Sequence, residues 1–363
     1  MTFRTILIAL LVIAGPTSPV FARGIPPVDV TVSGEASPEL LADFRQALNR
    51  MANRQTNGAQ PPSPARDEGL IDLEQFWKVE QDVPYAIGGD SPRQRLNITY
   101  PFEGEPPYRF IVHFHGGDWA TGSRQSAANA PAYWAIYQGY AVVDVGYRLA
   151  DKAQWPAQLH DAKAAIRFLR ANADQYQLDA ERIVVMGSGA GGHLAQMLAA
   201  TNGDSAAQDP DMGYGDASPE VQGVVSWSGV SDITTMGEQG RTAADRLMGY
   251  PAYQSELALE ASPVARVHEN FPPILLLHGT NDRWAPFEQS ARMAIRVNAA
   301  TGRSTATLDL LINARHQDPR IGTKEIMSKS LNFVDRILFP DDGNPHRSTF
   351  YPGIQTTGTS EQP

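Results

Sequence analysis

The sequence predicts an α/β fold in which a mostly parallel central sheet is flanked by helices. From about Glu74 onward, short β-rich apolar runs alternate with amphipathic helical segments, and this alternation is typical of βαβ units. The chain of 363 residues is 42% hydrophobic and 19% charged, which is ordinary for a globular protein. A core large enough for such a sheet can therefore be buried.

Apolar runs place the strands, and apolar residues at helical spacing place the helices. The expected strands lie at 95–100, 110–114, 141–145, 183–186, 221–227, 274–277 and 307–311. The expected helices lie at 156–172, 190–200, 287–299 and 324–338. Between Ser231 and Asn270 the regularity weakens, and this excursion could form a small cap over the sheet.

The first residues have the layout of a secretory signal peptide. Arg4 is followed by an unbroken apolar run from Ile6 to Ala14, and Val20-Phe21-Ala22 offers small residues for cleavage. Because the run is too short to span a bilayer, we expect residues 1–22 to be removed and the protein to be periplasmic or extracellular. A buried strand or an N-terminal anchor is the alternative. No other segment is long and apolar enough to cross a membrane.

Three further regions follow the signal peptide. We expect an N-terminal extension at 23–73, with a helix that begins at Ser37-Pro38 and a proline-rich linker from Gln55 to Asp67. The α/β domain is expected at 74–340. The tail at 341–363 is rich in Pro, Gly, Ser and Thr, and we expect it to be disordered.

Charge and cysteine content exclude several classes of function. The net charge is -10 and the pI is about 5.3, and no basic cluster is present, which argues against nucleic-acid binding. The absence of cysteine excludes disulfides, thiolate metal sites and a cysteine nucleophile. No cluster of metal ligands stands out, so we expect neither a metal nor another cofactor.

A glycine-rich turn joins the strand at 183–186 to the helix that follows. Gly187 and Gly191 have the spacing of the outer glycines in Gly-x-Ser-x-Gly, the nucleophile elbow, but the central position holds Gly189. A phosphate-binding loop is excluded because its lysine and hydroxyl residue are missing. A dinucleotide-binding loop would use Gly187, Gly189 and Gly192, but the strand is expected in mid-sheet and no convincing acidic partner follows.

Three more segments complete a catalytic layout in the order nucleophile, acid, histidine. After the strand at 110–114, glycines let the backbone amides of Gly117 and Asp118 point at one spot, as an oxyanion hole requires. Asp282 and His316 each follow a later strand. Taken singly, these segments could be a tight turn, a helix cap and a solvated loop histidine.

From about Gln81 to Phe339 the chain resembles the secreted esterase branch of the α/β-hydrolase superfamily. This branch includes carboxylesterases, acetyl xylan esterases and feruloyl esterases related to hormone-sensitive lipase, and kynurenine-formamidase-like enzymes share several of its motifs. The matching pieces are His115-Gly116-Gly117-x-Trp119, Tyr147-Arg148-Leu149-Ala150, Pro156-Ala157-Gln158-Leu159 leading to Asp161, the elbow from Gly187 to Leu194, Ala261-Ser262-Pro263-Val264, and His278-Gly279-x-x-Asp282.

The resemblance implies an α/β-hydrolase fold and a small-molecule or carbohydrate ester as substrate. It implies that Asp282 orients the histidine, that His316 is the general base, and that the backbone N–H groups of Gly117, Asp118 and Ala190 form the oxyanion hole. It also implies that His115 braces the oxyanion turn and that His193 is structural. Nothing in it separates aliphatic from acetylated or feruloylated sugar esters.

Two departures from the family pattern matter. Gly189 occupies the position of the serine, and the neighbouring Ser188 is expected to point elsewhere on a sharp elbow. Asp118 stands where many relatives have a third glycine, and an inward carboxylate would oppose the negative charge of an oxyanion.

Without a serine hydroxyl there is no acyl-enzyme, so we expect an inactive or strongly impaired esterase. Three explanations stay open. The protein has lost hydrolysis and keeps the cleft to bind an ester, a glycan or a partner; or Gly189 is an incidental or engineered change in an active esterase; or the protein hydrolyses something by a serine-independent route. A formamidase-like amide hydrolase is a further alternative to an ester hydrolase.

Overall fold

The computed structural model describes residues 29–33, 69–89, 91–251, 255–341, 343–348 and 356–357. The predicted signal peptide, the helix that begins at Ser37 and the proline-rich linker lie outside these residues. Within the described ranges, no helix combines the length and the apolar character needed to cross a membrane.

The described residues form a nine-stranded sheet in the order β1-β10-β9-β8-β7-β5-β6-β4-β3. The neighbours from β1 to β6 pair in parallel, whereas β4 pairs antiparallel with both β6 and β3. The strands are β1 (Asp29–Ser33), β3 (Val79–Pro84), β4 (Arg95–Thr99), β5 (Phe110–Phe114), β6 (Ala141–Val145), β7 (Val184–Ser188), β8 (Gly223–Trp227), β9 (Ile274–Gly279) and β10 (Ala306–Leu311). The strand that leads into the glycine-rich turn, β7, lies at the centre with four strands on either side.

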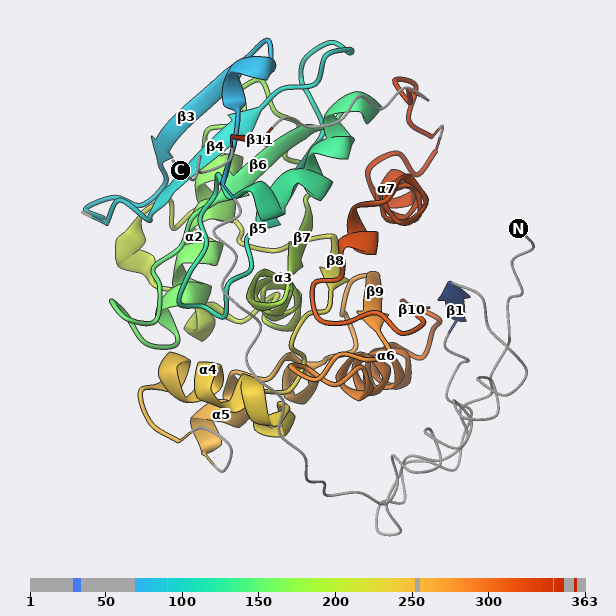
Figure 1. Cartoon of the computed structure of the whole chain (residues 1–363). Helices are drawn as coiled ribbons and strands as arrows, with labels where there is room; N and C mark the ends of the chain where they lie inside the picture. Colours follow the sequence, from blue (N-terminus) through green and yellow to red (C-terminus); the bar gives the residue numbers. More distant parts are fainter. Residues whose placement is uncertain are drawn as a thin grey trace, which may run out of the picture.

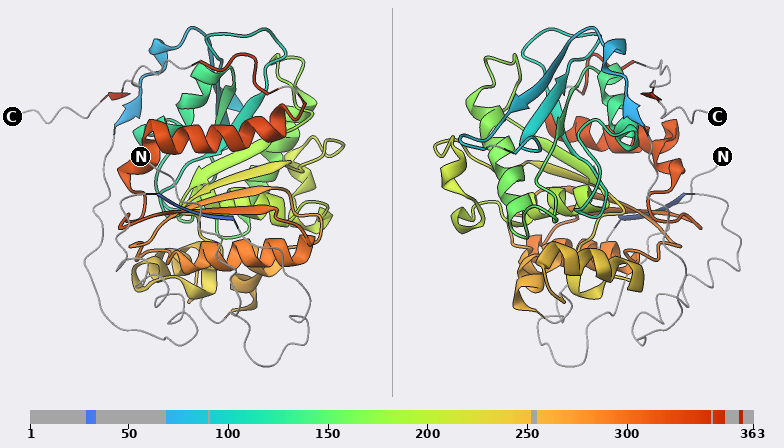
Figure 2. Two further views of the ribbon diagram at one scale, coloured as in Figure 1. Left: turned by 90° about the vertical axis from the view of Figure 1, so that its right-hand side faces the viewer. Right: turned by 60° about the vertical axis from the view of Figure 1, so that its left-hand side comes forward.

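Helices cover both faces of the sheet, as Figures 1 and 2 show. One face packs against α2 (Ala157–Ala171), α3 (Ala190–Ala200) and α6 (Glu288–Thr301), and the other against the 3-10 helix η3 (Ala127–Gln138) and α7 (Lys324–Leu338). Because successive side chains of a strand point to opposite faces, Val112 of β5 joins the first core and Ile111 joins the second. The predicted α/β class is confirmed.

Several elements of the structure were not indicated by the sequence patterns, among them β3 and η3. β3 is an edge strand whose residues are mostly exposed or half-buried, so it carries no continuous apolar run. η3 contains Pro131, and a proline interrupts the regular spacing that predicts a helix. The predicted strands and helices of the domain are present, with ends that differ by a few residues.

The irregular excursion between Ser231 and Asn270 contains two helices, α4 (Glu238–Met248) and α5 (Glu256–Glu260), which lie beside α6 in Figure 1. The N–H of Trp155 donates to the carbonyl of Leu247 at 3.0 Å, and the N–H of Gly237 donates to the carbonyl of Trp284 at 3.0 Å. These bonds tie α4 to the loops after β6 and β9, so this helix borders the edge of the sheet where parallel strands end.

Described segments near both termini pack on the α/β domain. β1 extends the sheet beyond β10, and β11 (Thr356–Thr357) pairs antiparallel with β2 (Leu70–Ile71). In the stretch at 343–348, the carbonyl of Ser348 accepts from Gln138 Nε2 at 2.5 Å, and Arg347 pairs with Asp335 at 3.0 Å. The ordered body therefore extends beyond the predicted boundaries at 74 and 340, because two-residue strands and single contacts leave no periodic trace in a sequence.

Candidate active site

The topology of the sheet has a switch point between β5 and β7. The chain leaves β5 for β6 on one side and leaves β7 for β8 on the other, and a ligand-binding crevice forms at the carboxyl ends of strands where the direction reverses. The turn of Gly117 follows β5, the turn of Gly189 follows β7, and the loops of Asp282 and His316 follow β9 and β10. All four predicted segments thus reach the same edge of the sheet.

The turn after β7 has the backbone geometry of a nucleophile elbow. Gly189 lies at φ 54° and ψ -112°, a conformation that L side chains rarely adopt. A Cβ on Gly191 would lie 1.9 Å from the carbonyl oxygen of Phe114, and a Cβ on Gly187 would lie 2.4 Å from the backbone of Gly191. The outer glycines are therefore required because the turn packs directly on β5.

Asp282 and His316 come together although 34 residues separate them, with His316 Nδ1 donating to Asp282 Oδ2 at 2.7 Å. The other oxygen of Asp282 accepts from the N–H groups of Trp284 at 2.9 Å and Ala285 at 3.0 Å. Burial alone would raise the pKa of Asp282, but the charge of His316 and the hydrogen bonds from His278 and His316 hold it well below the ordinary value. The carboxylate is thus ionised and fixed in direction.

The second ring nitrogen of His316 points at residue 189. A Cβ on Gly189 would lie 3.2 Å from His316 Nε2, and this nitrogen is buried without a hydrogen-bond partner among the described residues. Burial lowers the pKa of His316, but the adjacent Asp282 carboxylate outweighs it, with a further contribution from Asp118, so the pKa is raised above its ordinary value. The imidazole therefore presents an unpartnered nitrogen to residue 189, where glycine supplies no hydroxyl.

The turn after β5 holds three consecutive residues at positive φ, namely Gly117 at 104°, Asp118 at 58° and Trp119 at 59°. Such strain in non-glycine residues is typical of functional sites. The N–H groups of Gly117 and Asp118 have no acceptor in the described part of the chain, and Ala190 begins α3, where the N–H has no partner within the helix. The three predicted oxyanion donors are thus available to a ligand oxygen.

Comparison with known proteins assigns this arrangement to a family. The family model BD-FAE matches residues 96–296, more than half of the chain. The chain belongs to the BD-FAE family. It is 28% identical over 338 residues to Esterase LipC of Mycobacterium tuberculosis, covering 83% of both chains, and 28% identical over 289 residues to Esterase LipQ of the same organism, covering 76% of this chain and 66% of LipQ.

Solved structures agree with this assignment. A truncated form of a carbohydrate esterase from gut microbiota has a TM-score of 0.66 and 25% identity, over 74% of this chain and 99% of that one. The predicted membership of the α/β-hydrolase superfamily, in its esterase branch, is confirmed. This BD-FAE protein is a carboxylic ester hydrolase by family, and the roles of its individual site residues remain predictions.

Two buried histidines brace the site of this BD-FAE protein. His115 donates from Nδ1 to the carbonyl of Gly116 at 2.7 Å and stacks on Tyr147 at 4.2 Å between ring centroids. His193 accepts from Trp119 Nε1 at 3.2 Å and donates to the carbonyl of Ala261 at 2.7 Å. Burial lowers the pKa of His115 to about 3 and that of His193 to about 4, so both are neutral supports of the oxyanion turn.

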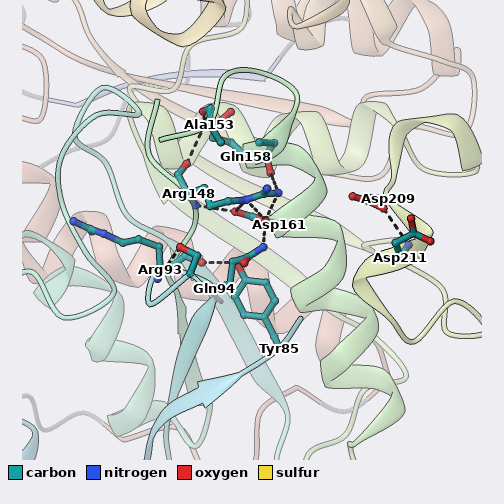
Figure 3. A network of polar contacts seen from close by, with 12 residues as sticks. Tyr85, Arg93, Gln94, Arg148, Ala153, Gln158, Asp161, Asp209 and Asp211 are labelled. Carbon is teal, nitrogen blue, oxygen red and sulfur yellow. Dashed lines mark hydrogen bonds and ion pairs between the residues drawn. The ribbon is translucent and has the colours of Figure 1, made fainter. Parts of the chain in front are cut away.

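A polar network around the buried Asp161 links Gln94, Arg148 and Gln158 (Figure 3). Asp161 accepts from the backbone N–H of Arg148 at 2.7 Å, and the guanidinium of Arg148 bonds both of its carboxylate oxygens, with Nε at 3.0 Å from each. Gln94 Nε2 donates to Asp161 at 2.9 Å, and Gln158 Nε2 donates to the carbonyl of Arg148 at 3.0 Å. The hydroxyl of Tyr147 then donates to the carbonyl of His115 at 2.9 Å, which connects the network to the oxyanion turn.

The carboxyl group of Asp118 lies close enough to His316 for the two charges to interact. Burial raises the pKa of Asp118, while His316 and Arg246 of α4 act in the opposite direction. A carboxylate here would oppose negative charge in the crevice, whereas the backbone N–H of Asp118 has no acceptor among the described residues.

Three residues near the site had no predicted role. His278 donates from Nε2 to Asp282 Oδ2 at 3.1 Å, and its Nδ1 is 2.7 Å from Ser290 Oγ. Trp284 stacks on His316 at 6.1 Å between ring centroids. The third is Gln317, whose side chain reaches the elbow. The motif His278-Gly279-x-x-Asp282 could have indicated the first, but only the folded loops place the other two.

No group of three or more His, Cys, Asp or Glu side chains in the described ranges could hold a metal ion.

Proposed function

We propose that this protein binds a carboxylic ester in the crevice but does not form an acyl-enzyme as its sequence stands. The observation that carries the proposal is the unpartnered Nε2 of His316, which faces the Cβ position of Gly189 at 3.2 Å. An esterase of this type attacks with a hydroxyl at that position. Without it, binding and the oxyanion donors alone would leave acceleration of roughly 10³–10⁴-fold over water.

A serine at position 189 would complete a catalytic triad with Asp282 and His316. Its Oγ would donate to His316 Nε2 and attack the ester carbonyl carbon as the proton moves to the imidazole. The oxyanion would accept from the N–H groups of Gly117, Asp118 and Ala190. Asp282 would stabilise the imidazolium and keep the proton of Nδ1 in place.

We propose a carbohydrate ester as the ligand class. This is supported by the name of the solved relative, a carbohydrate esterase matched over 99% of its chain, and by family membership. Acetylated xylo-oligosaccharides, p-nitrophenyl acetate and a formyl-amide substrate distinguish sugar-ester, general-ester and formamidase-like activity in parallel assays.

The experiment compares the unmodified chain with Gly189→Ser on short-chain p-nitrophenyl esters and on a serine-directed phosphonate. Turnover and labelling at residue 189 in the variant alone support the proposal. Rapid turnover by the unmodified chain with labelling at Ser188 would overturn it, because the elbow would then be misplaced by one residue.

We further propose that the protein is exported, on the basis of the apolar run from Ile6 to Ala14 and the small residues before Arg23. Fractionation of the producing cells and N-terminal sequencing of the mature protein test this. A mature chain that begins at Arg23 in the periplasm or medium supports export, and an intact Met1 in the cytosol contradicts it.

A further inference from the structure

The side chain of Gln317 reaches two turns at the carboxyl edge of the sheet, one after β5 and one after β7. A Cβ on Gly116, in the turn after β5, would lie 2.6 Å from Gln317 Nε2, and a Cβ on Gly189, in the elbow after β7, would lie 3.2 Å from the same atom. The amide nitrogen therefore sits where the oxyanion turn and the nucleophile position meet.

The loop directs this side chain through a strained backbone. Gln317 has φ 51°, an unusual value for a residue that is not glycine, and it directly follows His316. Asp318 closes the loop, since its carboxylate accepts from the N–H of Arg315 at 3.2 Å and from the N–H of Arg320 at 3.1 Å. Strain of this kind persists where the surroundings hold it and is concentrated at functional sites.

Gln317 is an exposed residue, so its side-chain amide is open to a ligand. A side-chain amide nitrogen carries two N–H donors, and the nearby N–H groups of Gly117 and Asp118 lack an acceptor in the described structure. The amide of Gln317 and the N–H groups of the turn after β5 thus lie beside the elbow, where an ester would react. The carbonyl oxygen of an ester is an acceptor that fits there.

We propose that Gln317 Nε2 donates a hydrogen bond to the carbonyl oxygen of the bound ester, as a side-chain member of the oxyanion hole. The inference rests on the proposed function, since it requires that esters bind in this crevice. A neutral donor here offsets the repulsion between the oxyanion and the carboxylate of Asp118, which also interacts with His316 and Arg246. Because the amide carries no net charge, its effect is not screened by counterions.

The first test uses the protein with its glycine. In ¹⁵N-labelled protein titrated with p-nitrophenyl acetate, the side-chain N–H resonances of Gln317, assigned by their loss in Gln317→Met, are expected to move downfield on binding. An ester that binds without moving these resonances overturns this inference alone. Failure of the ester to bind overturns the proposed function as well, and the two failures are thereby distinguished.

The second test uses the Gly189→Ser background. Gln317→Met keeps the length of the side chain and removes the donor, so kcat is expected to fall about a hundredfold with little change in KM, as when one oxyanion donor is lost. Gln317→Glu keeps the shape and adds a negative charge, so its loss is expected to be larger. An equal or faster rate in Gln317→Met would overturn the proposal, because the amide would then merely obstruct the crevice.

Discussion

Replacing Gly189 by serine is expected to create the missing nucleophile at a small cost in stability. The new Cβ would lie 3.2 Å from both His316 Nε2 and Gln317 Nε2, so each neighbour must retreat by a few tenths of an ångström. The φ of 54° and ψ of -112° cost an L side chain about 1–3 kcal/mol. A hydrogen bond from Oγ to His316 returns about 1 kcal/mol, so we expect a net loss of about 0–2 kcal/mol.

The gain in rate should be far larger than this loss of stability. In a serine hydrolase, removal of the nucleophile lowers kcat by about 2 × 10⁶-fold, and restoring it should reverse most of that loss. Because Asp118 opposes the oxyanion and the new Cβ crowds Gln317, we expect an increase on the order of 10⁵. Gly189→Ala is the matched control, since it carries the same backbone strain without a hydroxyl.

The assay is hydrolysis of p-nitrophenyl acetate, with phosphonate titration to count active sites and urea unfolding to measure stability. We expect Gly189→Ser to be fast and labelled, and Gly189→Ala to match the unmodified protein in rate while unfolding at lower urea. The geometric argument is refuted if the serine variant is folded yet within tenfold of the alanine variant.

The remaining predictions concern the groups that support the site. Because Asp282 raises the pKa of His316, kcat/KM of the Gly189→Ser enzyme should fall in acid, with a midpoint above the ordinary histidine pKa. At higher pH, kcat/KM should not change. A pH–rate profile with a midpoint below the pKa of free histidine would contradict this. Adding Asp282→Asn should shift that midpoint down and lower kcat about 10⁴-fold, measured in the same profile. Because the pKa of Asp282 is lowered in the folded protein, its ionised carboxylate stabilises the fold fully above about pH 4. This stabilisation is lost as the pH falls through the pKa of Asp282 in the folded protein. The free energy of unfolding of Asp282→Asn, measured with urea, should therefore fall less steeply with acid than that of the unmodified protein. Arg148→Ala removes the guanidinium that pairs with the buried Asp161 and leaves only the bonds from Gln94 and from the backbone N–H of residue 148. Because Arg148 is partly exposed, the loss should be about 3 kcal/mol in urea unfolding, and a loss under about 1 kcal/mol would show the ion pair to be dispensable.

Local patterns in the sequence determined most of the scaffold. Apolar runs marked seven strands, and the glycines at 187 and 191 marked the elbow, because each depends only on residues that are adjacent or a few positions apart. The chain order of Gly189, Asp282 and His316 also followed from the sequence, as did the superfamily. The partly exposed edge strand β3 and the proline-containing η3 escaped prediction because neither has a regular apolar period.

Only the tertiary structure decided how the site is assembled. The order of the sheet brings Asp282 to His316 and places the unpartnered Nε2 of that histidine opposite Gly189. It also sets the amide of Gln317 against two glycines from different strand ends. These distances join residues that lie far apart in the chain, and they depend on strand order and on strained loop backbone. A local sequence pattern does not encode either of these, so the chemistry of the crevice became visible only in the folded chain.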